Sequence, residues 1–250
     1  AVGLDNQLII VDSQNSRVRK MDLNAPVIPE YEPMPNTQSG NIVTVGGTGL
    51  WGYSGDGKDP RTTRFNHPGR IAVDGAGNLI IADRSNHRVR VIYKNYRTAT
   101  LAGTGERGYS GDGGEAVDAL VSFPTDVAVD PADGAIYFTD QGNNVVRRIL
   151  LNGRIETVAG TGVAGFNGDG PALETQLNSP DGLALHNGVL YIADSLNHRV
   201  RALNLATGDL ATLAGDGTTG YGEEGATALT SPVPTPQGMD VDAANGRLLI

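Results

Sequence analysis

Aspartate, asparagine and arginine are the residue types here best suited to acid–base or ligand chemistry, and most of them recur at a fixed spacing. One pattern occurs four times: an Asp is followed three residues later by an Asn, and the Asn four residues later by an Arg. The members are Asp12, Asn15 and Arg19; Asp83, Asn86 and Arg90; Asp140, Asn143 and Arg147; and Asp194, Asn197 and Arg201. Asp and Asn commonly bond their own backbone in turns. We therefore interpret the acidic and amide residues as turn caps, and the arginines as partners of carboxylates within or between units.

A single aspartate lies in each of three glycine-rich loops, at Asp56, Asp112 and Asp169. Calcium is normally bound by several converging oxygen ligands. Since each loop offers only one acid, the sequence favours a turn-capping role over a calcium site.

Histidine is scarce, with four residues in the chain. His87 and His198 occupy equivalent repeat positions, His67 precedes Pro68, and His186 replaces an aspartate found in other units. A zinc site with three histidines cannot be assembled from this set. Cysteine is absent, and no G-x-S-x-G motif is present. We predict no catalytic residue, no metal site and no cofactor.

Polar residues that differ from unit to unit are the better candidates for ligand binding. Such residues stand just after a recurring proline, where the chain enters a short apolar run. They are Arg70, Thr125, Asp126, Asp181 and Gln237. From this set we select Arg70, Asp126, Asp181 and Gln237 as the predicted binding residues.

The elements that must position these residues form a repeat. The recurring prolines are Pro68, Pro124, Pro180 and Pro236, at intervals of 56 residues. Such even spacing is typical of one stacked or circular unit. The chain holds four full units and half of a fifth.

The residue pattern of each unit predicts four short strands. In the unit that begins at Pro68 they cover 71–73, 79–82, 87–93 and 98–102, and the alternating valines and arginines of 88–91 indicate a half-buried third strand. A glycine-rich connection of about twenty residues follows. We expect short helical turns at 115–120, 173–177 and 227–229. Four antiparallel strands repeated around a ring make an all-β propeller, which we favour over a parallel solenoid with its shorter, stricter period.

The motifs A-D-R-S-N-H-R-V-R and A-D-S-L-N-H-R-V-R, with T-V-A-G-T-G and G-Y-S-G-D-G, resemble the NHL-repeat family of β-propellers. The resemblance covers residues 1–250 as one domain, apart from a proline-rich insertion at 24–40 that we expect to be a surface loop. It implies a six-bladed ring, which at this period needs on the order of 330 residues. It does not imply an activity, because one fold hosts many functions.

Three arrangements remain open for the ends of the repeat array, since an open arc would expose strand edges. Residues beyond both ends complete the ring, which we favour. Alternatively the ring closes with five blades, or the terminal half-blade pairs with another copy and produces head-to-tail self-association.

Composition limits the partners. The formal net charge of −9 disfavours nucleic acid, which binds clustered Lys and Arg. No run of about 18 apolar residues exists, so we expect no membrane span. Cysteine content does not determine the cell compartment, and we predict an extracellular or periplasmic location.

Two functions follow from these patterns. The first, which we favour, is a non-catalytic scaffold whose one face binds a protein or carbohydrate partner. This face carries the loops before each first strand and the turns that begin with the repeated Asp. The alternative is a metal-dependent hydrolase or lyase with its site at the mouth of the central channel.

Overall fold

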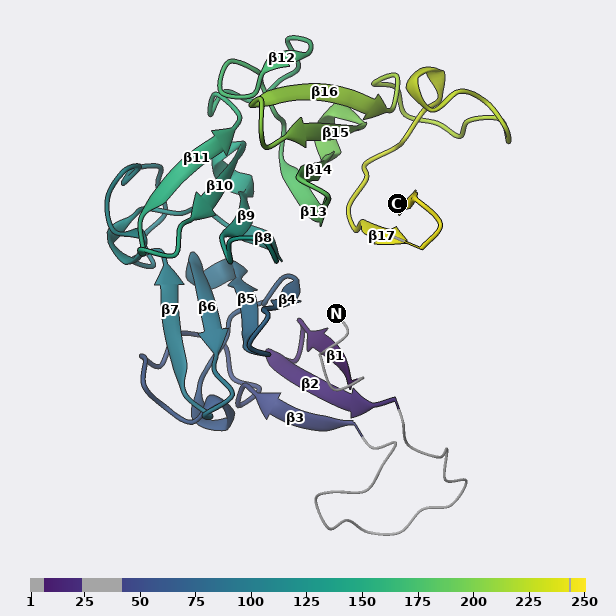
Figure 1. Ribbon diagram of the computed structural model, residues 1–250. Coiled ribbons are helices and arrows are strands. Elements are labelled where there is room, and N and C mark those ends of the chain that lie inside the picture. The colour runs from purple at the N-terminus through teal and green to yellow at the C-terminus, as the bar shows by residue number, and fades with distance from the viewer. Residues whose placement is uncertain (1–6, 24–41, 243) are drawn as a thin grey trace.

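The protein is built from five antiparallel β-sheets that lie side by side along an arc (Figure 1). The computed structural model describes residues 7–23, 42–242 and 244–250. The first strand of each complete sheet faces the centre of the arc, and the last strand lies at the periphery. Within these ranges no helix is long and apolar enough to cross a membrane.

Each complete sheet follows the predicted order of four strands. The first sheet contains β1 (Gln7–Asp12), β2 (Arg17–Asp22) and β3 (Val43–Gly46). The second contains β4 (Ile71–Val73), β5 (Leu79–Asp83), β6 (Arg88–Ile92) and β7 (Thr98–Ala102). The third contains β8 (Pro124–Val129), β9 (Ile136–Asp140), β10 (Val145–Ile149) and β11 (Ile155–Ala159). The fourth contains β13 (Pro180–His186), β14 (Val189–Asp194), β15 (Arg199–Asn204) and β16 (Asp209–Ala214), with β12 (Gly170–Pro171) added at its outer edge, and the fifth contains β17 (Asp240–Asp242) and β18 (Arg247–Leu249).

Short 3₁₀ helices connect these strands. Three follow the second strand of a sheet, namely η2 (Arg84–Asn86), η4 (Gln141–Asn143) and η5 (Ser195–Asn197). The other three lie in the long connections, as η1 (Pro60–Thr62), η3 (Ala116–Asp118) and η6 (Ala228–Thr230).

Two of the three predicted helical turns are confirmed, as η3 and η6. The prediction at 173–177 is wrong, because this segment forms only a tight turn. Gly170 and Pro171 pair with β16, and the Glu174 amide then donates to the Pro171 carbonyl to close the turn. The proline-rich insertion predicted at 24–40 lies outside the described residues.

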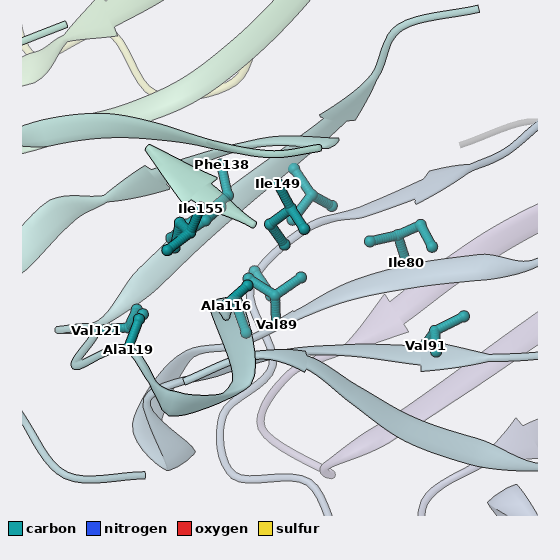
Figure 2. Packing of buried hydrophobic residues seen from close by; sticks show 12 residues of the cluster. Ile80, Val89, Val91, Ala116, Ala119, Val121, Phe138, Ile149 and Ile155 are labelled. Carbon is teal, nitrogen blue, oxygen red and sulfur yellow. The ribbon is translucent and has the colours of Figure 1, made fainter. Parts of the chain in front are cut away.

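The hydrophobic core lies between neighbouring sheets. Figure 2 shows side chains of the second sheet, including Ile80 and Val89, facing Phe138 and Ile155 of the third. Ala116 on η3 lies beside Val89 in this cluster. Each large aliphatic side chain buried in this way stabilises the fold by about 1.5–3 kcal/mol. Packing between sheets, rather than the short strands themselves, therefore holds the arc together.

The third strand of each complete sheet buries an arginine, which corrects the prediction of a half-buried strand. Arg90, Arg147 and Arg201 are each 0% exposed. The alternation of apolar and charged residues suggested one face in water, but both faces of these strands are covered. Burial of a guanidinium is possible only because carboxylates and carbonyl oxygens surround it.

Each buried arginine contacts one aspartate of its own sheet and one of the preceding glycine-rich loop. Arg147 lies 3.6 Å from Asp140 and 2.6 Å from Asp112. Arg90 and Arg201 have the same pair of partners, at Asp83 and Asp56 and at Asp194 and Asp169. Carboxylate pairing of the repeated arginines is thus confirmed.

The loop aspartates have a different role from the predicted turn caps. Asp112 accepts a hydrogen bond from the backbone amide of Thr157 on β11, 45 residues away, as well as from Arg147. Asp56 and Asp169 bind Thr100 and Thr212 in the same manner. These carboxylates therefore fasten each connecting loop onto the outer strand of the next sheet.

The arc does not close among the described residues. In the part of the chain that the structure describes, the first sheet begins with β1, the equivalent of β5, and the fifth sheet contains a first and a second strand. No strand pairing joins these two sheets within the described chain. The number of blades and head-to-tail self-association stay predictions.

Candidate functional site

Three of the four predicted binding residues meet at one end of the central cavity. Arg70 precedes β4, Asp126 lies near the start of β8, and Asp181 is the second residue of β13. Because these strands are neighbouring first strands that run the same way through the sheets, their entry ends lie together on one face. We call this the mouth face: the face that carries Arg70, Asp126, Asp181 and the helices η2, η4 and η5.

Beneath the mouth face lies a cavity of about 650 Å³. Its walls are the innermost strands β1, β4, β8, β13 and β17. Most lining residues are aliphatic, such as Ile71, Val127 and Leu185. The charged groups Arg70 and Asp126 stand at the mouth, and Asp240 and His186 also line the wall. Aliphatic walls with a few polar groups are common in ligand sites.

Arg70 spans the mouth and joins three sheets. Its Nη1 lies 2.5 Å from Asp181 Oδ1 in the fourth sheet and 3.8 Å from Asp126 Oδ2 in the third. Asp181 also accepts a hydrogen bond of 3.2 Å from Gln141 Nε2, and Gln141 Oε1 accepts one of 3.3 Å from Arg84. The result is a continuous polar chain across the mouth, from Arg84 to Asp126.

Asp126 is the most deeply buried member of this chain. It is 4% exposed, and its carboxylate accepts hydrogen bonds from the amides of Val127 and Leu183. Burial raises the pKa of Asp126 to about 7, an effect that the positive charge of Arg70 and the two amides partly oppose. This carboxyl group can therefore gain or lose a proton near neutral pH.

The backbone before each first strand fixes this geometry through close contacts between sheets. The amide of Arg70 donates to the carbonyl of Thr125, and the hydroxyl of Thr125 donates to the carbonyl of Asp181. At Gly182 an added Cβ would lie 1.8 Å from the carbonyl oxygen of Gln237. Glycine is required there, because any side chain would push the fourth and fifth sheets apart.

Gln237, the fourth predicted residue, does not join the network. It is exposed, and its side chain makes no hydrogen bond to a described residue. Only its backbone takes part, through the contact with Gly182. Whether its side chain binds a ligand stays a prediction.

Arg84 and Gln141 belong to the site but were not singled out in the sequence. Both directly follow a repeated aspartate, at a position where the four units have Ser13, Arg84, Gln141 and Ser195. The variation at this one position was the sequence signal that could have identified Arg84 and Gln141 as site residues. The predicted face does include these turns, so it was the individual residues that were missed.

The repeated Asp and Asn residues are used within the scaffold. Asn143 Nδ2 donates to Asp140 and to the carbonyl of Gly108, and Asp140 accepts from the amide of Ser122. The same contacts recur at Asn86 and Asn197. Across the described ranges, no group of three His, Cys, Asp or Glu side chains is placed to hold a metal ion.

Family models and curated relatives agree on the repeat. The NHL repeat model matches residues 65–92. Protein SUPPRESSOR OF QUENCHING 1, chloroplastic, of Arabidopsis thaliana is 34% identical over 181 residues, which are 70% of this chain and 17% of that protein. Human NHL repeat-containing protein 2 is 33% identical over 115 residues, 46% of this chain and 16% of that protein. The chain thus spans about a sixth of the length of these relatives.

Solved structures share the architecture at low sequence identity. An auxiliary nutrient binding protein from Bacteroides ovatus matches with a TM-score of 0.68 and 15% identity, over 99% of this chain and 54% of that one. Virginiamycin B lyase from Staphylococcus aureus matches with a TM-score of 0.58 and 13% identity, over 99% and 60%. These structures share the fold alone, whereas the NHL repeat model and the NHL-repeat relatives show the family: the chain belongs to the NHL-repeat family of β-propellers.

Proposed function

We propose that this chain is a non-catalytic scaffold whose mouth face binds a protein or carbohydrate partner through Arg70 and Asp181, with the buried Asp126 holding Arg70 in place. The supporting observation is the convergence of these three residues. They come from three different sheets and differ between units, yet they meet within one ion network at the opening of the cavity.

The repeated and the variable polar residues differ in how they are used. Arg147 and Asp140 are both fully buried and bind each other, so they are not available to a partner. The side chains of Arg70 and Asp181 are 35% and 20% exposed, so part of each charge still faces solvent. A partner that covers them would meet a preorganised pair of charges, and preorganisation reduces the entropy lost on binding.

One solved structure with a similar fold supports a binding role by analogy only. The Bacteroides ovatus structure is described as a nutrient binding protein, whereas the Staphylococcus aureus structure is a lyase. Since one fold hosts both, the argument depends on the site itself. The mouth offers charges and an apolar cavity, but its described residues include no cluster of metal ligands for the hydrolase or lyase alternative.

The test is a binding screen on the full chain. The wild type, Arg70→Gln and Asp181→Asn are applied to peptide and glycan arrays, and Arg97→Gln is the matched control. Arg97 is exposed in the turn between β6 and β7, at the ends of the strands opposite the mouth face. We expect the wild type and Arg97→Gln to bind the same ligands, and the two mouth variants to lose at least about tenfold in affinity.

Two results would contradict the proposal. One is ligand binding that is equal in the wild type and both mouth variants. The other is turnover of a bound glycan or a lactone by the purified chain, abolished by a metal chelator, which would support the hydrolase or lyase alternative.

A further inference from the structure

One sector of the mouth face gathers cationic and aromatic side chains around Phe123. The guanidinium carbon of Arg107 lies 4.7 Å from the centre of the Phe123 ring, and that of Arg84 lies 5.3 Å from it. The His87 ring packs edge-on against Phe123 at 4.6 Å, and its Nδ1 accepts the Phe123 amide. We call Arg84, His87, Arg107 and Phe123, with Trp51 and His67 beside them, the basic–aromatic sector.

The repeat architecture places these residues on the mouth face. Asn86 of η2 donates to the carbonyl of Gly52, directly after Trp51, and Asn143 of η4 donates to the carbonyl of Gly108, directly after Arg107. Trp51 also stacks on His67 at 4.9 Å, and His67 precedes the proline that leads to Arg70. The loops, the 3₁₀ helices and the strand entries are thus fastened to one another in each unit.

The sector is specific to the second and third sheets. In the next unit the equivalents of Arg84, Arg107 and Phe123 are Gln141, Ala164 and Ser179. These residues carry neither charge nor aromatic ring, so the scaffold does not require the cluster. Residues that the fold does not need are those most able to serve recognition.

Arg84 and Arg107 lack acidic partners. Neither forms an ion pair with any carboxylate of the described residues, although the buried arginines of the same sheets form two each. Arg84 donates only to the amide oxygen of Gln141. Burial lowers the pKa of His87, and the positive charges of Arg107, Arg88 and Arg84 lower it further. On a chain of net charge −9, this sector is therefore locally positive.

Exposed apolar side chains lie on the loop that Asn86 of η2 holds. Trp51 is 62% exposed and Leu50 58%. Further along the same face, Leu196 on η5 is 53% exposed, and Val163 is 58% exposed in the loop that Asn197 holds. Tryptophan and arginine beside aliphatic groups are typical of protein interfaces. Aliphatic side chains contribute little to a polysaccharide or nucleic-acid site, and two unpaired guanidinium groups are too few for a polyanion.

We propose that the basic–aromatic sector binds an acidic segment of a protein partner, with carboxylates held by Arg84 and Arg107 and apolar side chains against Trp51. Arginine binds carboxylates through paired N–H donors, which suits this role. The inference rests on the proposed function, because it names the partner class for the same face.

The test is an array of random nonapeptides probed with the full chain, followed by fluorescence anisotropy on the peptides that bind. Tetragalacturonate and an oligouridylate serve as the sugar and nucleic-acid probes. The variant is Arg84→Gln/Arg107→Gln, and the matched control is Arg97→Gln/Arg154→Gln, whose exposed arginines lie in turns at the opposite ends of the strands. Circular dichroism checks that both fold.

We expect bound peptides to be enriched in Asp and Glu next to apolar residues. Their affinity should fall at least about tenfold in the Arg84→Gln/Arg107→Gln variant and with added salt, and be unchanged in the control. No acidic enrichment, or tighter binding of tetragalacturonate or oligouridylate, overturns the inference. If affinity falls in Arg70→Gln but not in Arg84→Gln/Arg107→Gln, the inference fails while the proposed function stands. If no ligand of any class binds, both fail.

Discussion

Replacing Arg147 by methionine tests the scaffold role of the repeated polar residues. Methionine has a similar length and keeps the apolar part of the side chain, but it removes the charge and all the donors. Arg147 contacts Asp112 at 2.6 Å and Asp140 at 3.6 Å, and it donates to the carbonyls of Leu120 and Ser110 at 3.0 and 2.9 Å. All four contacts are lost in the variant.

The largest cost comes from Asp140, which is 0% exposed. Without Arg147 it keeps hydrogen bonds from Asn143 and the Ser122 amide, but its charge stays buried without a counter-charge. Breaking a buried ion pair on one side costs about 3–5 kcal/mol. That is a large part of the roughly 5–15 kcal/mol by which domains are stable. We therefore expect Arg147→Met to be strongly destabilised, and Arg147→Met/Asp140→Asn to recover part of the loss.

The pH dependence supplies an independent check. Burial already raises the pKa of Asp140 to about 7, and removal of Arg147 raises it further. A folded-state pKa above the unfolded value means that the folded state binds the extra proton, so stability rises as pH falls. Urea unfolding followed by circular dichroism should show a larger deficit for Arg147→Met at pH 8 than at pH 5.5. A deficit below about 1 kcal/mol at pH 8, or an equal deficit at both pH values, would refute the reasoning.

Two further variants test the packing at the mouth. Burial raises the pKa of Asp126 to about 7, so its contribution to stability is greatest below the unfolded pKa and is lost as pH rises through 7. Asp126→Asn should therefore flatten the decline of the unfolding free energy between pH 5 and 8, by about 2–3 kcal/mol, and an unchanged slope would contradict this. Gly182→Ala should lower the melting temperature by several degrees, because its Cβ would lie 1.8 Å from the Gln237 carbonyl. Gly238→Ala at the equivalent position meets nothing closer than 3.6 Å and should melt like the wild type, so equal melting of the two variants would be the contrary result.

The sequence predicted the fold well where local pattern decides the structure. The strands at 71–73 and 98–102 were placed with their observed bounds, because apolar runs between glycine-rich turns leave little choice. The burial of Arg90 was missed because a charged residue in an alternating strand usually faces water. Its partner Asp56 lies 34 residues earlier, and only the packed structure brings the two together.

The candidate site was predicted in part. Arg70, Asp126 and Asp181 were identified because they break the repeat at a position where strands enter the sheets, and the structure brings them into one network. The group around Phe123 was missed, since Phe123 and Arg107 are isolated in sequence and meet only through the packing of the connecting loops. Periodicity reveals where units differ, but not which differences become neighbours.

The most direct test of the central claim is the affinity of Arg70→Gln for a ligand selected on the arrays, measured together with its unfolding free energy. Arg70 is variable between units and partly exposed, so the account predicts at least about a tenfold loss of affinity with a much smaller loss of stability than in Arg147→Met. Unchanged affinity in this variant would contradict the claim that the variable residues of the mouth face, and not the repeated ones, carry the function.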